Sequence, residues 1–268
     1  MLIDVHAHFY TELSGRSDWR DLNARRLDAG DRIGITAHVG SILGTWGAQS
    51  PTYFPSPDDV HHANERMLQI QQAASGKAFG YCVVNPNYPA HAVEQITRWL
   101  DEGMIGIKLA ASRRANDPLL DPIAQMAAQR GVPILHHVWQ HRRRDWPGQE
   151  ASDAVELAAL ARRHPEAKFI LAHLGGGGDW RHTLRAVVEP GNIWIDLSGS
   201  GSDVGMIENA IEAVGLRRLV WGTDLTMDTG WGKLLYLESL DVTIQDRQLV
   251  RHRNACEIFP AGVFDGGD

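Results

Sequence analysis

The sequence has few cysteines and no long apolar run, and each shortage excludes a class of protein. Cys82 and Cys256 are the two cysteines among 268 residues, and their distance along the chain indicates reduced thiols, not a disulfide framework. No uninterrupted apolar stretch approaches the roughly 18 residues that a membrane-spanning helix needs. The first apolar run begins at residue 2 without a basic and apolar leader. We therefore expect a soluble, cytoplasmic protein that does not associate with membranes.

An excess of positive charge is also missing. The formal net charge is -7, which argues against a nucleic-acid-binding surface but is compatible with a local basic pocket for a small anion. With 268 residues, of which 43% are apolar, the chain is long enough to bury a large core. We expect a single domain over residues 1–268, as a monomer or a homo-oligomer.

Apolar runs rich in β-branched residues alternate along the chain with segments that are typical of helices. This alternation predicts a parallel sheet, and eight such runs are the number that closes a (β/α)8 TIM barrel. The runs begin near Leu2, Ile33, Ala78, Ile105, Val132, Phe169, Ile193 and Leu219. Residues 231–240 and 244–259 are predicted as terminal helices that cover the barrel wall.

Turn and capping residues support the same alternation independently of hydrophobicity. Ser56 and Asp121 each precede a proline, which is typical of a helix N-terminus. Gly103 and Gly131 follow predicted helices as C-terminal stops. These signals place helices between the predicted strands.

Two histidines lie in the first predicted strand, in the sequence Asp4-Val5-His6-Ala7-His8. Side chains alternate faces along a strand, so His6 and His8 project from the same side, about 7 Å apart along it. That spacing allows both imidazoles to bind one metal ion, although two histidines on a solvated strand face would show the same pattern.

Polar residues also end three later strands. The fifth run ends in His136-His137, the sixth in His173 and the eighth in Asp224. In an α/β barrel the carboxyl ends of the strands surround the active site. Only one residue of the His136-His137 pair can face the barrel mouth, and we favour His137 because it lies nearer the end of the strand. A bulge would select His136 instead.

Together these motifs resemble the amidohydrolase superfamily, in the amidohydrolase-related branch that also includes aminocarboxymuconate-semialdehyde decarboxylase. The resemblance covers nearly the whole chain. It is carried by residues 4–8, 133–137, 169–176, 195–199 and 221–224.

The resemblance implies that a divalent metal is held by His6, His8, His137 and Asp224. It also implies that His173 is either an acid or base beside a single metal or a ligand of a second one. Binuclear members supply a carboxylated lysine or a glutamate from strand four. Here that strand offers Lys108, and its carboxylation stays an open alternative.

The chemistry of these residues agrees with the resemblance. Neutral imidazoles and one carboxylate, with a position left for water, suit catalytic Zn²⁺, our first choice, and also accommodate Mn²⁺ or Fe²⁺. A bound ion lowers the pKa of its water from about 15.7 towards 7. Asp224 is then placed to accept a proton from that water, and His173 to stabilise an oxyanion or protonate a leaving group.

Residues near the predicted site indicate an anionic small-molecule substrate. Lys108 lies within strand four and Arg113 just after it, where cationic groups bind carboxylates. Trp139 follows strand five and offers a stacking wall for a ring. Ser198 follows strand seven, where contact with substrate and a purely structural hydrogen bond are both open.

Three functions follow from these residues. The first is metal-dependent hydrolysis of a C–O or C–N bond in a small carboxylate-bearing molecule. The alternative is metal-dependent, non-oxidative decarboxylation of an unsaturated or aromatic acid, in which water and His173 would protonate the substrate carbon before CO2 leaves. The third is binding without turnover. It is less favoured because structural zinc usually has four protein ligands and this set leaves room for water.

Overall fold

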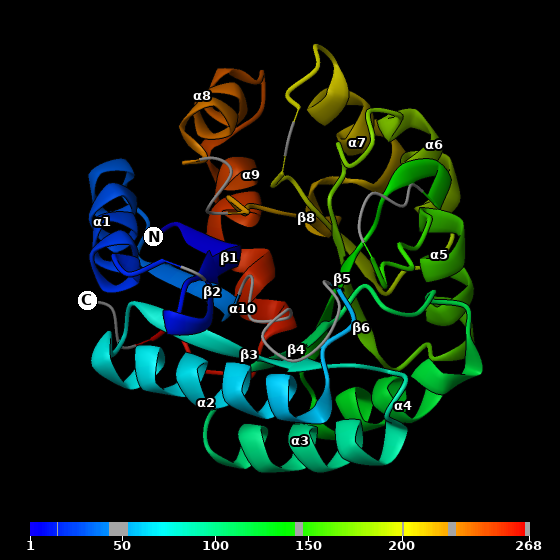
Figure 1. Ribbon diagram of the computed structural model, residues 1–268. Coiled ribbons are helices and arrows are strands. Elements are labelled where there is room, and N and C mark those ends of the chain that lie inside the picture. The colour runs from blue at the N-terminus through cyan, green and yellow to red at the C-terminus, as the bar shows by residue number, and fades with distance from the viewer. Residues whose placement is uncertain (15, 43–52, 143–146, 200, 225–228, 266–268) are drawn as a thin grey trace.

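Eight parallel strands form one sheet in which each strand pairs with its sequence neighbours (Figure 1). The computed structural model describes residues 1–14, 16–42, 53–142, 147–199, 201–224 and 229–265. The strands are β1 (Ile3–Phe9), β2 (Ala37–Ile42), β3 (Ala78–Val84), β4 (Gly106–Leu109), β5 (Pro133–His137), β6 (Lys168–Ala172), β7 (Ile193–Asp196) and β8 (Leu219–Val220). The Val5 amide donates to the Trp221 carbonyl at 3.1 Å, and the Asp224 amide to the His6 carbonyl at 2.7 Å. These bonds bring the end of the sheet back to its start, which confirms the TIM barrel.

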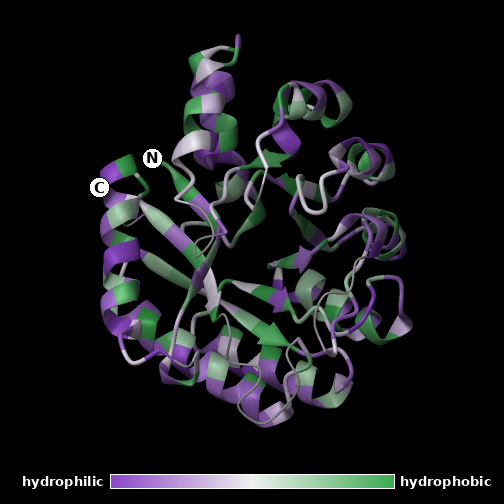
Figure 2. Ribbon diagram, turned by 45° about the horizontal axis from the view of Figure 1, so that its top comes forward, coloured by the Kyte–Doolittle hydropathy of each residue, from purple (hydrophilic) through white to green (hydrophobic). Residues whose placement is uncertain are grey.

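Helices follow the strands and surround the barrel, and they mix hydrophobic and hydrophilic residues along their length (Figure 2). They are α1 (Trp19–Ile33), α2 (Pro57–Ala73), α3 (Pro89–Asp101), α4 (Asp121–Arg130), α5 (Ala154–Arg163), α6 (Trp180–Val187), α7 (Met206–Val214), α8 (Trp231–Ser239), α9 (Ile244–Gln248) and α10 (Asn254–Ile258). Ser56 caps α2 through the Asp59 amide, and Gly131 ends α4 at φ 66°, both as predicted. Among the described residues, no helix combines the length and the apolar character that crossing a bilayer requires.

Three predicted boundaries differ from the structure. The eighth run was expected to end in Asp224, but β8 ends at Val220 and Asp224 lies beyond it. The second apolar run was expected to begin a strand near Ile33, but Ile33 is the last residue of α1 and β2 begins at Ala37. Gly34 adopts φ 85° and ends the helix, so the strand starts only after it. Asp121 is the first residue of α4 and not its cap, because a short 3-10 turn precedes it and is capped by Asp117.

The apolar core has two parts. One lies between the strands and the surrounding helices. The other fills the barrel interior with side chains such as Val39, Leu135 and Ile170, and it includes Phe259 and Phe264 from the C-terminal segment. Phe264 shares a small cavity with Met1, so this segment lies at the amino ends of the strands. The polar side chains described next lie at the opposite end.

Candidate metal centre

An irregularity in β1 turns both of its histidines toward the barrel interior. Val5 belongs to the interior apolar cluster, and strict alternation would then send His6 outward. However, the register of β1 against β2 shifts between Asp4 and Ala7, and Ala7 packs into the outer cluster. Such irregularities often re-aim side chains next to active sites. Here His6 and His8 end on the same side, as the sequence predicted.

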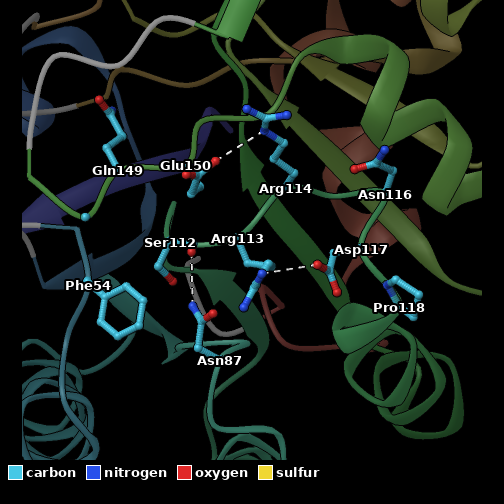
Figure 3. A pocket seen from close by; sticks show the side chains of 11 residues that line it. Phe54, Asn87, Ser112, Arg113, Arg114, Asn116, Asp117, Pro118, Gln149 and Glu150 are labelled. Atoms are coloured by element: carbon cyan, nitrogen blue, oxygen red, sulfur yellow. Dashed lines mark hydrogen bonds and ion pairs between the residues drawn. The ribbon is translucent and has the colours of Figure 1, made fainter.

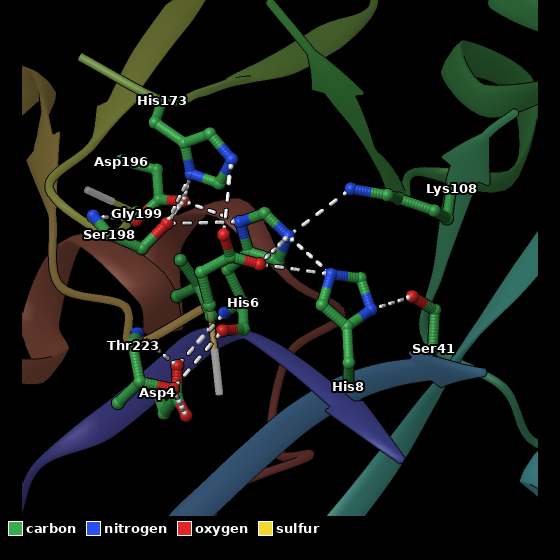
Figure 4. Close-up of polar contacts among 12 residues, drawn as sticks. Asp4, His6, His8, Ser41, Lys108, His173, Asp196, Ser198, Gly199 and Thr223 are labelled. Atoms are coloured by element: carbon green, nitrogen blue, oxygen red, sulfur yellow. Dashed lines mark hydrogen bonds and ion pairs between the residues drawn. The ribbon is translucent and has the colours of Figure 1, made fainter. Parts of the chain in front are cut away.

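The imidazoles of His6 and His8 point toward each other (Figure 4), and both lie near the carboxylate of Asp224. The two Nε2 atoms are 3.1 Å apart, and Asp224 Oδ1 lies 3.1 Å from His8 Nε2 and 3.6 Å from His6 Nε2. Two ligands that each lie about 2.1 Å from one cation are separated by about 3.0 to 3.4 Å. The three atoms are therefore spaced as ligands of one ion.

Asp224 is held in an uncommon backbone conformation. Its φ is 54°, in the left-handed region that non-glycine residues seldom occupy, and its amide donates to the His6 carbonyl. Burial opposes ionisation of the carboxyl group, but the surrounding His173, His6 and His8 outweigh it and lower its pKa well below the usual value. Asp224 is therefore an ionised group, as a metal ligand must be.

His173 lies directly beside this group. Its ring stacks on the ring of His6 with centroids 4.9 Å apart, and its Nε2 lies 3.4 Å from Asp224 Oδ2. Gly199 passes so close that a Cβ there would lie 2.6 Å from His173 Cγ. Burial lowers the pKa of His173 to about 4, so the imidazole is neutral at pH 7.

Asp196 and Ser198 contact the Nδ1 atoms of the His6 and His173 rings. The Asp196 carboxylate lies 2.8 Å from His6 Nδ1, and Ser198 Oγ lies 2.8 Å from His173 Nδ1. Ser198 also donates its hydroxyl to Asp196. Carboxylates that bind the second nitrogen of a metal-ligating histidine fix its tautomer and orientation. Burial raises the pKa of Asp196 to about 7.

His136 and His137 point to opposite faces of β5. His137 lies on the face of Leu135 that belongs to the interior core, and its ring centroid is 5.3 Å from that of His173. His136 Nε2 instead lies 2.7 Å from Ser152 Oγ. Of the two, His137 therefore faces the other histidines.

The residues present fit a divalent cation. His137 Nε2 is buried and has no hydrogen-bond partner within the described part of the chain. Burial lowers the pKa of both His6 and His137 well below the usual value, which leaves neutral imidazoles with lone pairs to share. A buried group of neutral imidazoles around a carboxylate is a ligand set for a metal of the zinc and manganese class.

Lys108 extends from β4 into the same group. Its Nζ lies 3.2 Å from His6 Nε2, and burial lowers the pKa of the amine to about 8. Ile107 and Leu109, its neighbours in the strand, pack into the outer cluster. The sequence therefore placed Lys108 correctly within the strand, and the structure puts its amine beside the ligand atoms.

A cavity of about 930 Å³ opens at the same end of the barrel. Its lining comes from segments that follow β2 to β5, and Arg113 and Arg114 belong to it (Figure 3). Arg113 Nη1 pairs with Asp117 at 3.3 Å, and Arg114 Nε lies 3.2 Å from Glu150. Arg113 thus lines a cavity as expected, but the sequence did not reveal its acidic partner.

Trp139 and Ser198 occupy different places around the site. The Trp139 ring lies 5.9 Å from that of His137 and so borders the histidine group. Ser198 contacts the Nδ1 atoms of His6 and His173, which is a supporting position, and it is not among the residues that line the cavity. The structure therefore brings the predicted residues to one barrel end, with Arg113 in a cavity whose lining includes none of the clustered histidines or Asp224.

Two contributing residues were not predicted. Asp196 ends β7 as the other polar residues end their strands, so its position alone was the available signal. Ser41 contacts His8 Nδ1 at 3.0 Å from β2. A serine in an apolar strand gives no comparable signal because serine is common in both buried and exposed positions.

Comparison with known sequences yields one family. The sequence model described as Amidohydrolase matches residues 3–261. No curated protein matched the chain significantly.

Solved structures share the fold at low sequence identity. One is a 2,6-dihydroxybenzoate decarboxylase in complex with 2,6-dihydroxybenzoate (17% identity, 96% of this chain and 98% of that one, TM-score 0.72). Another is the 5-carboxyvanillate decarboxylase from Sphingomonas paucimobilis (18%, 96% and 98%, TM-score 0.73). A third is a dihydroxybenzoic acid decarboxylase from Polaromonas sp. JS666, with bound manganese and the inhibitor 2-nitroresorcinol (17%, 96% and 96%, TM-score 0.74).

Proposed function

The chain belongs to the amidohydrolase family, and we propose that it is a metal-dependent, non-oxidative decarboxylase of a small aromatic carboxylic acid. The observation that carries the proposal is the convergence of His6 Nε2, His8 Nε2 and Asp224 Oδ1, with the neutral His173 stacked beside them. The sequence favoured hydrolysis of a C–O or C–N bond. The named activities of the similar structures move the preference to the alternative, decarboxylation.

His6, His8, His137 and Asp224 are the residues proposed to hold the cation. Manganese replaces zinc as the first candidate because the Polaromonas structure holds manganese, and imidazole with carboxylate suits either ion. When bound, the cation supplies a Lewis acid that polarises a substrate oxygen and acidifies a coordinated water. Asp196 and Ser41 keep the rings of His6 and His8 oriented through their Nδ1 atoms.

The proton transfer is assigned to His173 and Asp224. A proton taken up from solvent is passed by His173 Nε2 or Asp224 Oδ2, which are 3.4 Å apart, to the ring carbon that bears the carboxylate. The bond between that carbon and the carboxyl carbon then breaks, and its electron pair restores the aromatic ring as CO2 leaves. One proton is consumed and one CO2 is released, so no oxidant or reductant is needed.

Substrate recognition is assigned to Lys108, Arg113 and Trp139, with Ser198 supporting His173. Lys108 is buried beside the ligand atoms and supplies a positive charge for the reacting carboxylate. Arg113 Nε is buried and lacks a hydrogen-bond partner in the part of the chain that the structure describes, so it offers a donor to a polar substituent. Trp139 gives a flat apolar surface beside His137 for the ring.

The test is a substrate panel on protein that has been stripped of metal and reloaded. Hydroxylated benzoic acids, lactones and amides are each incubated with the Mn²⁺-loaded, Zn²⁺-loaded and metal-free protein, and both CO2 and acid release are followed. We expect CO2 from an aromatic acid that bears an ortho hydroxyl, and none from the metal-free protein. Hydrolysis of a lactone or amide without CO2 would select the first sequence-based hypothesis. No turnover of any class would contradict both catalytic assignments.

A further inference from the structure

A second group of imidazoles and carboxylates lies at the barrel rim, outside the metal centre. His141 follows β5, Asp153 directly precedes α5, Asp179 directly precedes α6, and His182 lies in the first turn of α6. All four belong to segments that follow β5 or β6. The function proposed above uses none of them.

The side chains of this rim cluster, His141, Asp153, Asp179 and His182, face one another. His182 Nε2 lies 2.8 Å from Asp153 Oδ1, and His141 Nε2 lies 3.0 Å from Asp179 Oδ2. The two imidazole rings are 4.9 Å apart between centroids. His141, Asp153 and His182 each offer one potential ligand atom, and these three atoms lie within 4.8 Å of one another.

Backbone amides fix both carboxylates in place. Asp153 caps α5 and accepts the amides of Val155 at 3.0 Å and His141 at 2.8 Å. Asp179 caps α6 and accepts the His182 amide at 3.1 Å. Burial of Asp153 raises its pKa, but the hydrogen bonds outweigh this and lower it, so the carboxyl group is ionised at neutral pH.

The backbone at His141 is also unusual. Its φ is 61° and that of Arg142 is 57°, both in the left-handed region where residues other than glycine are uncommon. The hydrogen bond from the His141 backbone amide to Asp153 holds this conformation. The conformation places the His141 ring against His182. Unusual backbone conformations of this kind persist only where several surrounding contacts hold them in place.

We infer that His141, Asp153 and His182 form a second binding site for a divalent transition-metal ion of the zinc, cobalt and nickel class. Two imidazoles and one carboxylate suit these ions better than magnesium or calcium, which prefer oxygen ligands. Ligands of a tetrahedral Zn²⁺ ion lie about 3.3 Å apart, so the 2.8 Å between His182 Nε2 and Asp153 Oδ1 needs to widen by only a few tenths of an ångström. Metal binding displaces the proton that these two atoms share.

Asp179 acts as the positioning residue of this site. It contacts His141 Nε2, in the manner of the outer carboxylates that orient metal-binding histidines. An ion bound here joins the segment after β5, which carries Trp139, to the N-termini of α5 and α6. The rim site therefore controls the position of a wall of the proposed substrate site without providing a catalytic group.

The test counts bound metal and does not depend on activity. Metal-free full-length protein is titrated with Zn²⁺ by equilibrium dialysis, and Co²⁺ is used to record the absorption of tetrahedral coordination. His141→Ala and His182→Ala should each bind one Zn²⁺ equivalent fewer than the wild type. His141 is 63% exposed, so its replacement leaves the core intact. Asp179→Asn should keep the site but weaken its Kd about tenfold, because it removes only the orienting contact.

His164→Ala is the matched control. His164 Nε2 lies 2.8 Å from Asp121 Oδ1, so it is also a histidine–aspartate pair, but no second imidazole faces it among the described residues. This variant should bind as many Zn²⁺ equivalents as the wild type. Equal stoichiometry in His141→Ala, His182→Ala and the wild type would overturn the proposal. Combining His141→Ala with His8→Ala should lower stoichiometry additively, which separates failure of the rim site from failure of the metal centre.

Discussion

The candidate metal centre and the cavity lined by Arg113 and Asp117 lie at the same end of the barrel, but they differ in how far their charged groups are exposed to water. At the metal centre, His6, His173 and Asp224 are almost completely buried and their pKa values are displaced far from the usual range. In the cavity, the Arg113 and Asp117 side chains remain 38% and 28% exposed and form an ion pair. The first region excludes water from its charges, whereas the second leaves them in contact with it.

The difference separates two tasks. Electrostatic interactions strengthen as water is excluded, so a buried cluster can bind a cation and move a proton. A partly exposed ion pair is worth only about 0 to 1 kcal/mol, so an incoming carboxylate can replace one of its partners at little cost. We therefore expect substitutions at the metal centre to abolish chemistry and substitutions in the cavity to change substrate preference.

The largest effect is expected from Asp224→Asn. The amide keeps the shape of the carboxylate but removes its charge, so both metal affinity and proton transfer are lost. Turnover should fall by about 10³-fold or more, with metal content falling in parallel. Elemental analysis and CO2 release measure the two quantities. Asp121→Asn, which alters another histidine-paired carboxylate away from the centre, should change neither. Wild-type metal content in Asp224→Asn would remove Asp224 from the ligand set.

His173→Gln separates the two roles that the sequence left open for this residue. A general acid can be removed without loss of metal, so turnover should fall by about 10² to 10⁴-fold while metal content stays at the wild-type level. If His173 is instead a ligand of a second ion, metal content should fall by one equivalent. A variant with normal metal content and normal turnover would exclude both roles.

Much of the candidate metal centre could be predicted from the sequence, because strand periodicity and strand ends are local signals. The ends of the sixth and eighth apolar runs placed His173 and Asp224 at the barrel mouth. Alternation allowed only one of His136 and His137 to face the mouth, and the position nearer the strand end favoured His137. The pairing of His6 with His8 was correct as well. However, strict alternation from the preceding residues would have turned both away from the interior, and only the register shift in β1 restores their direction.

Most of the remaining features depend on contacts that strand periodicity and strand ends do not reveal. Asp117 lies close to Arg113 in the sequence, yet nothing in the pattern predicts that they pair across the cavity wall. Asp196 reaches His6 across 190 positions, and Ser41 reaches His8 from a neighbouring strand. The end of α1 at Ile33 was missed because its apolar side chain suits a helix and a strand equally well.

Stability against pH should also distinguish the two regions. Burial lowers the pKa of His173 to about 4 and that of His136 to about 3, so both bind protons more readily when unfolded. Their contribution to stability is complete above about pH 6.5 and is lost as the pH falls toward these values, at about 1.4 kcal/mol per pH unit for each group. Burial raises the pKa of Asp196 to about 7, so protonation of this carboxyl group stabilises the folded protein as the pH falls from about 7 to 4. It is a single group, and the buried histidines that act in the opposite direction are more numerous.

The measurement is the urea midpoint of metal-free protein between pH 7 and 4.5. The midpoint should fall as the pH falls, and His173→Gln should fall less steeply because one titrating imidazole is gone. Arg113→Gln should follow the wild-type curve, since the ion pair that it removes lies in the partly exposed cavity. A midpoint that rises on acidification would mean that the carboxyl groups outweigh the buried histidines.

The smallest effect is expected in the cavity. Arg113→Gln removes the buried Nε donor, which has no partner among the described residues, and the partner of Asp117, but it leaves the proposed metal ligands untouched. KM for an aromatic acid with a second anionic substituent should rise about tenfold, which corresponds to one charge-assisted hydrogen bond, while kcat changes little. Arg163→Gln, at another arginine–aspartate pair outside the cavity, should leave KM unchanged. If kcat falls and KM stays constant, Arg113 acts on the transition state, and the division between a reactive metal centre and a cavity for substrate recognition no longer holds.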